Sequence, residues 1–278
     1  MACRSGITWR ASGMISICAV IAVRNEAAYL PVLLPLLAAQ QIDVAILDHE
    51  STDGSRDLYA GYMGRPIISV QDLTYEGVYS QTQQLEAKQS LYSTLSHDWV
   101  IHHDADEVME GDRPGCGLRD AICDADKNGF DAINFDEFVF LPSPGQDCVG
   151  KDYVENIRRY YFFEPAKNRL NRAWRRKLPV SNIFSGGHLL TDRVAAFFPR
   201  NMPLRHYIAL SEEHAIRKYV NRRFGDHELQ RGWHANRVGL TKEKLAFPAR
   251  SEFLFTHEPD GSIPFRKDRP TRLHYWSW

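Results

Sequence analysis

Apolar stretches alternate with amphipathic stretches between residues 15 and 110. The apolar ones are short and rich in Val, Ile and Leu, which is typical of buried strands. We expect strands at residues 15–23, 44–47, 66–70 and 98–103, with helices between them at 27–40, 53–63 and 81–95. Pro31 fits the first turn of the first helix, and Pro35 should kink it. This order gives right-handed βαβ units, so we predict an α/β fold with a mostly parallel, Rossmann-like sheet flanked by helices. Such sheets bind ligands beyond the carboxyl ends of their strands.

The pattern is looser after residue 113. We expect a helix at 113–127, strands at 130–141 and 158–163, a helix from Ser211 to about residue 224, and helical pieces at 226–233 and 240–246. Ser211 is a good N-cap, and Glu212 and Glu213 suit the positive end of that helix. No repeat or low-complexity linker interrupts the chain. We therefore expect one domain with helical C-terminal elaborations, preceded by a tail at residues 1–13 or by an upstream start used in place of Met14.

The composition is that of an ordinary globular protein. The chain has 278 residues, of which 44% are hydrophobic and 25% charged, which excludes collagen, a coiled coil and a wholly disordered chain. The longest apolar run, residues 15–23, is far shorter than the roughly 20 residues of a membrane helix, and the N-terminus makes a poor signal peptide. The five cysteines are widely spaced without a CxxC pair, so we expect reduced thiols and a cytoplasmic protein.

The charges are divided unevenly along the chain. Residues 1–150 carry 9 Lys and Arg against 22 Asp and Glu, a net charge of −13, whereas residues 151–278 carry 25 against 13, a net charge of +12. The two halves are either complementary faces of one domain, or a carboxylate site for a divalent cation beside a basic region that faces an anionic substrate or a membrane surface.

The strongest candidate for chemistry is the sequence WVIHHDADE at residues 99–107. It places Asp104 and Asp106, two residues apart, at the end of an apolar strand. Such a pair can hold a hard cation through oxygen, and Mn²⁺ or Mg²⁺ fits best because these ions bridge carboxylates and phosphate oxygens. The alternative is an acidic surface turn.

Two weaker candidates lie at the ends of the first two strands. Asp48 closes the second strand and begins the sequence DHESTDGS, in which Ser51, Asp53 and Gly54 form a tight turn that opens the next helix. For Ser51 and Asp53, helix capping is the simpler interpretation. Arg24-Asn25-Glu26 follows the first strand and means little alone.

Together, Asn25-Glu26 after the first strand, DHESTDGS and DADE resemble the family 2 glycosyltransferases, which have the GT-A fold. More closely, they resemble the bacterial branch in which DADE follows a strand that begins with Trp. The resemblance covers residues 14–110, with a weaker echo in Gly187-His188, residues 204–207 and residues 211–223.

The resemblance implies a metal-dependent enzyme that moves a sugar from a nucleotide-sugar donor to an acceptor hydroxyl, with inversion. Residues 14–150 would bind the donor and residues 151–278 would shape the acceptor side. The metal, Mn²⁺ or Mg²⁺, would be held on the diphosphate by Asp104 and Asp106. The residues expected to surround the donor are Asn25, Glu26, Asp48, Glu50, Asp53 and Asp104, with Asp48 at the nucleoside.

An inverting transfer also needs a base near the acceptor hydroxyl. Many relatives place an acidic base in an ED pair downstream of DxD. This chain offers Asp136-Glu137, about 30 residues after DxD, and Glu212-Glu213 at a helix start. Neighbouring residues of a strand point to opposite faces, so only one can face the cleft, and we favour Glu137. GT-A enzymes often complete the metal site with a late histidine. His188 follows two glycines and is our choice, with His206 as its rival, although a lone histidine is more often structural.

The basic stretch from Arg169 to Lys177 has three interpretations: a solvated face, a clamp for diphosphate, or a contact with anionic lipid or a phosphorylated acceptor. We expect a glycan or lipid-linked acceptor, with peripheral membrane contact open. Nucleic acid is disfavoured because the net charge is near zero and no binding motif is present.

Three other functions compete. A haloacid-dehalogenase-like phosphatase would use Asp104 as its nucleophile, but three strand signals precede Asp104 and the later GDxxxD element is absent. A sugar nucleotidyltransferase has a Gly-rich phosphate loop near its N-terminus, and this sequence lacks one. A non-catalytic GT-A-like binding domain would be indicated if the carboxylates did not converge on one cleft.

Overall fold

The computed structural model describes residues 14–165, 168–191, 196–220, 222–258 and 264–278, so the expected tail at 1–13 lies outside the described residues. The strands are β1 (Ile17–Val23), β2 (Asp43–Asp48), β3 (Ile67–Asp72), β4 (Trp99–Asp104), β5 (Glu107–Met109), β6 (Ala132–Leu141), β7 (Arg159–Phe163), β8 (Asn171–Arg175), β9 (Met202–His206) and β10 (Phe255–Thr256). The α-helices are α1 (Leu30–Ala39), α2 (Ser55–Tyr62), α3 (Gln81–Thr94), α4 (Leu118–Lys127), α5 (Tyr153–Asn156), α6 (Glu212–Tyr219) and α7 (Asp226–Gln230), and the 3₁₀ turns are η1 (Ile183–Ser185), η2 (Ala235–Arg237) and η3 (Tyr275–Ser277).

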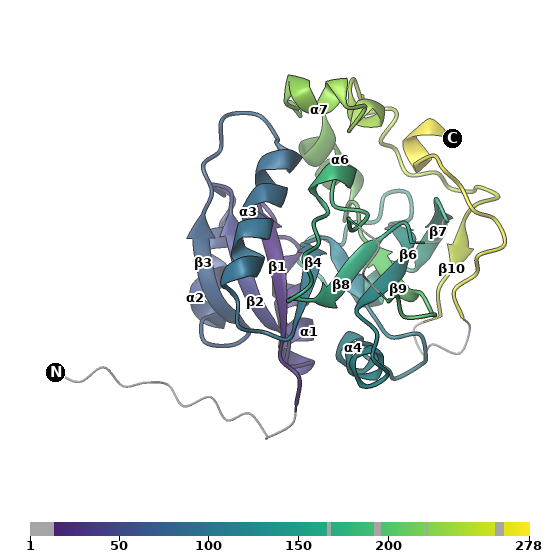
Figure 1. Cartoon of the computed structure of the whole chain (residues 1–278). Coiled ribbons are helices and arrows are strands. Elements are labelled where there is room, and N and C mark those ends of the chain that lie inside the picture. The colour runs from purple at the N-terminus through teal and green to yellow at the C-terminus, as the bar shows by residue number, and fades with distance from the viewer. Residues whose placement is uncertain (1–13, 166–167, 192–195, 221, 259–263) are drawn as a thin grey trace.

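The strands form one sheet in the order β10-β7-β6-β8-β4-β1-β2-β3, with β9 attached to β6 and β5 attached to β9. Strands β4, β1, β2 and β3 are parallel to one another, as the alternation of strands and helices predicts. The second half of the chain joins them through β8, which pairs antiparallel with both β4 and β6 (Figure 1). The predicted α/β fold with helices around a central sheet is confirmed.

Helices cover both faces of the parallel strands because alternate strand residues point to opposite sides. On one face Ile17, Ala19 and Ile21 of β1 pack in a core with residues of α1 and α4. On the other face Cys18 and Val20 pack with Leu91 and Tyr92 of α3 (Figure 1). The described cysteines, Cys18, Cys116, Cys123 and Cys148, are free. No helix in the described ranges has the length and apolar character that would let it cross a membrane.

Several elements of the second half differ from the sequence-based expectations. Helix α4 begins at Leu118 because Pro114 and Gly115 precede it, the latter with a φ of 74°. Helix α6 ends at Tyr219, earlier than expected, and residues 242–245 form turns instead of a helix. Part of the basic stretch that begins at Arg169 is strand β8.

The uneven charge distribution is explained by ion pairs between the two halves of the chain. Acidic residues before position 150 pair with basic residues after it, so the first and simpler interpretation of the charge pattern accounts for many of these charges. These pairs are Asp104–Arg172, Asp106–Lys218, Glu110–Arg205, Asp124–Arg200, Asp126–Arg175, Asp136–Lys267 and Glu137–Arg169.

Candidate active site

The carboxyl ends of β1, β2 and β4 lie side by side at one edge of the sheet. Their register places Val23 beside Asp48 and Ala22 beside Asp104. The polar segments that follow these strands therefore meet at the edge where α/β sheets bind ligands.

A cleft of about 700 Å³ opens at this edge. It is lined by Asp104, Asp106, Glu137, His188 and His206, so the carboxylates and histidines singled out by the sequence converge on one cavity. A second cavity of about 910 Å³ adjoins it, and the two share five lining residues: Arg24, Glu26, Tyr79, Lys218 and Arg222. Single ligand pockets usually measure about 300–1,000 Å³, so the two cavities together suit an extended ligand.

Asp104 ends β4 and projects into the cleft between two buried cations. Its Oδ1 lies 3.1 Å from Lys88 Nζ, and its Oδ2 lies 3.2 Å from Arg172 Nη2. Both cations are at most 7% exposed, whereas the Asp104 side chain is 43% exposed. Desolvation alone would raise the pKa of Asp104, but Lys88 and Arg172 hold it well below its usual value. Asp104 is therefore a permanent carboxylate that a ligand in the cleft can reach.

Asp106 is part of a buried series of ion pairs in which positive and negative side chains alternate. Its Oδ2 accepts from Lys218 Nζ at 2.7 Å and lies 3.3 Å from His206 Nε2. On the other side of the ring, His206 Nδ1 lies 2.7 Å from Glu137 Oε1, and Glu137 Oε2 accepts from Arg169. Burial lowers the pKa of His206, but Asp106 and Glu137 raise it well above its usual value, so the ring is a cation at pH 7.

The fit of a metal ion depends on which carboxylate oxygens can still accept a ligand. No three His, Cys, Asp or Glu side chains in the described part of the chain are placed to hold an ion together. A carboxylate has about four acceptor sites, so the half-exposed Asp104 can add one ligand bond to its two ion pairs. Mg²⁺ is commonly held by one or two carboxylates plus substrate phosphates. The residues therefore fit an ion held by Asp104 and a diphosphate, with Asp106 occupied by Lys218.

The residues predicted around the donor divide into two groups. Asn25, Glu26 and Asp53 line the second cavity. Oδ1 of Asp53 also accepts from the amide and the hydroxyl of Ser55, the first residue of α2, whereas the N-cap position itself is Gly54. Asp48 and Glu50 are not brought to either cavity.

Asp48 is fully buried and satisfied within the protein. Its Oδ2 accepts from the Tyr59 hydroxyl at 2.6 Å, and its Oδ1 accepts from the Ser51 amide at 3.0 Å and from Arg56 at 2.7 Å. Glu50 is an exposed residue between β2 and α2 with a φ of 53°. Contact of the Asp48 carboxylate with a nucleoside is therefore not what the geometry favours.

Of the two residues predicted as the base, only Glu137 lies in the cleft. Asp136 points to the opposite face of β6, where it accepts from Asn201 at 2.9 Å and from Lys267 at 2.6 Å. Both oxygens of Glu137 are engaged, by His206 and Arg169. Burial would raise the pKa of Glu137, but these partners hold it well below its usual range. Glu137 is better suited to position His206 than to accept a proton.

The two candidate histidines have different environments. His206 is adjacent to Asp106, whereas His188 lines the cleft without an ion pair to Asp104 or Asp106. The structure therefore does not bring His188 together with the two aspartates as a metal-binding group.

The basic stretch from Arg169 to Lys177 contains residues that line the cleft and residues that lie away from it. Arg169 and Arg172 line the cleft, as the diphosphate-clamp interpretation requires. Arg175 pairs with Asp126 and Asp131 away from it, and Arg176 donates to the backbone oxygen of His97. The Lys and Arg residues that line the cleft are Arg24, Arg169, Arg172, Lys218, Arg222 and Arg237.

Sequence reasoning missed two cations that shape the site. Lys88 is buried in α3 on the same face as Leu85 and Leu91, so a lysine at apolar helical spacing was its only signal. Lys218 lies in the last turn of α6, where a basic residue is expected for the helix dipole alone.

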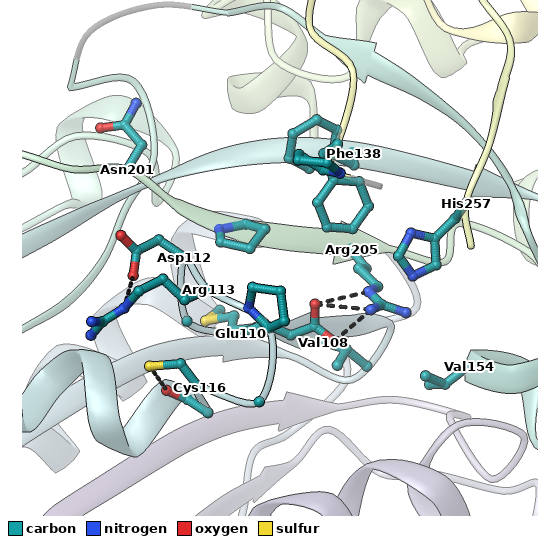
Figure 2. Close-up of a pocket in the computed structure, with 18 of the residues that line it drawn as sticks. Val108, Glu110, Asp112, Arg113, Cys116, Phe138, Val154, Asn201, Arg205 and His257 are labelled. Atoms are coloured by element: carbon teal, nitrogen blue, oxygen red, sulfur yellow. Dashed lines mark hydrogen bonds and ion pairs between the residues drawn. The ribbon is translucent and has the colours of Figure 1, made fainter. Parts of the chain in front are cut away.

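A third cavity, of about 540 Å³, has Val108, Glu110 and Arg205 among its lining residues (Figure 2). Strands β5 and β9 pair as an antiparallel ribbon. Glu107 and His206 are opposite each other in this ribbon and line the cleft, whereas the next pair, Val108 and Arg205, points to the other face and lines the third cavity. Arg205 is held by Glu110 at 2.7 Å. The third cavity is therefore separate from the cleft.

No model of a known protein family matches the sequence, and no curated protein is significantly similar to it. Among solved structures, TarS of S. aureus has a TM-score of 0.45 at 12% identity, over 83% of this chain and 42% of the TarS chain. TarS 1–349 in complex with UDP has a TM-score of 0.45 at 11% identity, over 83% of this chain and 69% of that one. A putative nucleotide-diphospho-sugar transferase from Desulfovibrio desulfuricans G20 has a TM-score of 0.30 at 10% identity, over 77% of this chain and 91% of that one. This chain thus spans less than half of the first TarS chain, and the likenesses are distant.

Proposed function

We propose that this protein is a glycosyltransferase of the family 2 type with a GT-A fold, which moves a sugar from a nucleotide-diphosphate sugar to an acceptor hydroxyl with inversion. The observation that carries the proposal is the cleft beyond the carboxyl ends of β1, β2 and β4. There the accessible carboxylate of Asp104 stands among six Lys and Arg side chains of the described residues. This combination suits a diphosphate that brings its own divalent ion.

The cations of the cleft have a defined task in such a reaction. When the bond between the sugar and the diphosphate breaks, negative charge grows on the leaving oxygens. Arg172 and Lys218 are held in place by Glu107 and Asp106 before the ligand arrives. Groups fixed in this way stabilise the growing charge without having to reorganise.

Mn²⁺ or Mg²⁺ is part of the proposal. Asp104 would hold it together with diphosphate oxygens, and Asp106 would join only where Lys218 releases it. The ion would supply Lewis-acid stabilisation of the leaving group. Lys88 and Arg172 fix the Asp104 carboxylate at the end of β4, whether or not the ion is bound.

The two cavities suggest how the donor lies. The second cavity, with Asn25, Glu26 and Asp53 at the ends of β1 and β2, would take the nucleoside. The main cleft would take the sugar and the acceptor, since it is lined by aromatic rings that suit sugar faces, including Phe163 and Trp233.

A glycan or lipid-linked acceptor remains the proposed partner, with peripheral membrane contact. Leu189, at the cleft, is 36% exposed, and Phe184, one residue before the cleft-lining Ser185, is 57% exposed. Apolar side chains beside a basic cleft suit an acceptor with a lipid tail and a phosphate.

A thermal-shift screen tests the proposal. UDP-, GDP-, CMP- and dTDP-sugars are added with and without Mn²⁺. A donor at 100 times its Kd stabilises the native state by about 2.7 kcal/mol, which corresponds to roughly 5 °C for a chain of this length. We expect one nucleotide to raise the Tm, and more so with Mn²⁺. No shift with any donor would contradict the proposal.

A further inference from the structure

Most carboxylates in the cleft are poor candidates for the base that an inverting transfer requires. Those of Asp106, Glu107 and Glu137 are at most 13% exposed and are paired with Lys, Arg or His. Asp104 is accessible but has a cation on each oxygen. A base needs a free lone pair that faces the acceptor, and these groups do not offer one.

His188 is presented to the cleft by a rigid turn. Gly186 and Gly187 have φ angles of 68° and 87°, which other residues rarely adopt, and they place His188 at the cleft wall. A Cβ on Gly187 would lie 3.2 Å from the His102 ring, so the turn packs closely over β4. The backbone oxygen of His188 accepts from the Asn171 amide of β8 at 2.7 Å, which fixes the turn to the sheet.

A hydrogen bond sets the tautomer of His188. Its Nδ1 lies 3.0 Å from the backbone oxygen of Ser185. A carbonyl oxygen only accepts, so Nδ1 carries the hydrogen, and in the neutral ring the lone pair is on Nε2. In the described part of the chain, Nε2 has no hydrogen-bond partner. Desolvation in the cleft, with Arg172 and Arg169 nearby, lowers the pKa of His188, so the ring is neutral at pH 7.

We propose that His188 is the general base of the glycosyl transfer, an assignment that rests on the proposed function. Nε2 takes the proton of the acceptor hydroxyl. The acceptor oxygen forms its bond to the anomeric carbon, and the bond between that carbon and the diphosphate oxygen breaks, its electron pair leaving with the nucleoside diphosphate. Ser185 holds the ring in the reactive tautomer, the arrangement in which a third group orients a base.

Glu164 is the rival. It lines the same cleft, its side chain is 46% exposed, and its ion pair to Arg169 is long, at 3.9 Å. It also has a φ of 40°, which is unusual for a glutamate. Within the described residues, however, no side-chain hydrogen bond orients the Glu164 carboxylate. The His188 ring, in contrast, is oriented by the hydrogen bond of Nδ1, and its backbone is bonded to β8.

The test uses donor hydrolysis, in which water takes the place of the acceptor. Release of nucleoside diphosphate is measured for the wild type, His188→Gln, Glu164→Gln and the control His227→Gln, whose ring is 53% exposed on α7. We expect His188→Gln to lower kcat by about 10²–10⁴-fold with donor Kd within threefold, and Glu164→Gln to lower it less than fivefold. His227→Gln should match the wild type. Imidazole should restore part of the activity of His188→Ala, which a structural role would not explain.

Each other outcome overturns the proposal. If His188→Gln keeps more than a third of the wild-type kcat, or if the large loss falls on Glu164→Gln, His188 is not the base. Nitrogen NMR of histidine-labelled protein adds a check that needs no donor: at pH 7 we expect a neutral ring with hydrogen on Nδ1, and a charged ring or hydrogen on Nε2 refutes the assignment. If the wild type binds no donor at all, the glycosyltransferase proposal itself fails, which is distinguishable from loss on substitution.

Discussion

The ion pair between Asp106 and Lys218 offers a direct test of the charge arrangement. Both side chains are at most 13% exposed, and their charged atoms lie 2.7 Å apart. At an effective dielectric constant of about 20, this attraction amounts to about 6 kcal/mol. Asp106→Asn removes the negative charge that faces Lys218 and the His206 cation. Breaking one side of a buried pair usually costs about 3–5 kcal/mol, and we expect a loss in this range because Glu26 lies near Lys218 and compensates part of the charge.

Thermal unfolding at pH 7 measures the effect. A loss of 3–5 kcal/mol lowers the Tm by about 6–10 °C for a chain of this length. Glu213→Gln removes an exposed ion pair to Arg217, and we expect less than about 1 kcal/mol from it. The double variant Asp106→Asn/Lys218→Met should recover much of the stability, because no buried charge is then left unpaired. A Tm within 2 °C of the wild type for Asp106→Asn, or no recovery in the double variant, would refute this reasoning.

Three further predictions concern carboxylates at the strand ends. Asp104→Asn should remove the Mn²⁺-dependent part of donor binding, and it should also lower the Tm without ligand because the buried Lys88 and Arg172 each lose a carboxylate partner. Calorimetric titration with and without Mn²⁺ would show an unchanged Mn²⁺ effect if Asp104 has no such role. Burial raises the pKa of Glu26 to about 7, so its ionisation lowers the free energy of unfolding as the pH rises from about 4.5 through 7. Glu26→Gln should therefore increase the free energy of unfolding by up to about 3 kcal/mol at pH 8, and raise the Tm there, but have little effect at pH 4.5. An equal change in Tm at both pH values would contradict this. Asp48→Asn disturbs buried hydrogen bonds and should lower the free energy of unfolding in urea by about 1–3 kcal/mol. The donor Kd should stay within threefold of the wild-type value. A loss of donor affinity without a loss of stability would instead indicate that Asp48 contacts the nucleoside.

The parallel part of the fold was predictable because its signals are local. Short apolar runs between helical stretches identify β1, β2, β3 and β4, and the ends of parallel strands must share one edge. Asp104 and Glu26 therefore line one cleft, and Asn25 lines the cavity that adjoins it. The alternation of side chains along β6 likewise allowed only one of Asp136 and Glu137 to face the cleft.

The missed features depend on contacts distant in sequence. Strand β8 was hidden because it lies within a basic stretch and two of its five residues are arginines, so only its pairing with β4 and β6 identifies it as a strand. Lys218 reaches Asp106 across 112 residues, so no local pattern reveals the pair. Asp48 follows a strand end as a ligand-binding residue would, yet Tyr59, 11 residues later, takes its oxygen. Spacing indicates which residues share an edge but not which partner each one takes.

The structure of the protein in complex with the donor that gives the largest thermal shift tests the central claim most directly. We expect the diphosphate in the cleft, in contact with Arg172 or Arg222 and next to Asp104, with the nucleoside in the cavity lined by Asn25 and Asp53. A donor bound in the third cavity beside Arg205, or on the surface away from the carboxyl ends of β1 and β4, would contradict the claim that this cleft is a nucleotide-sugar site.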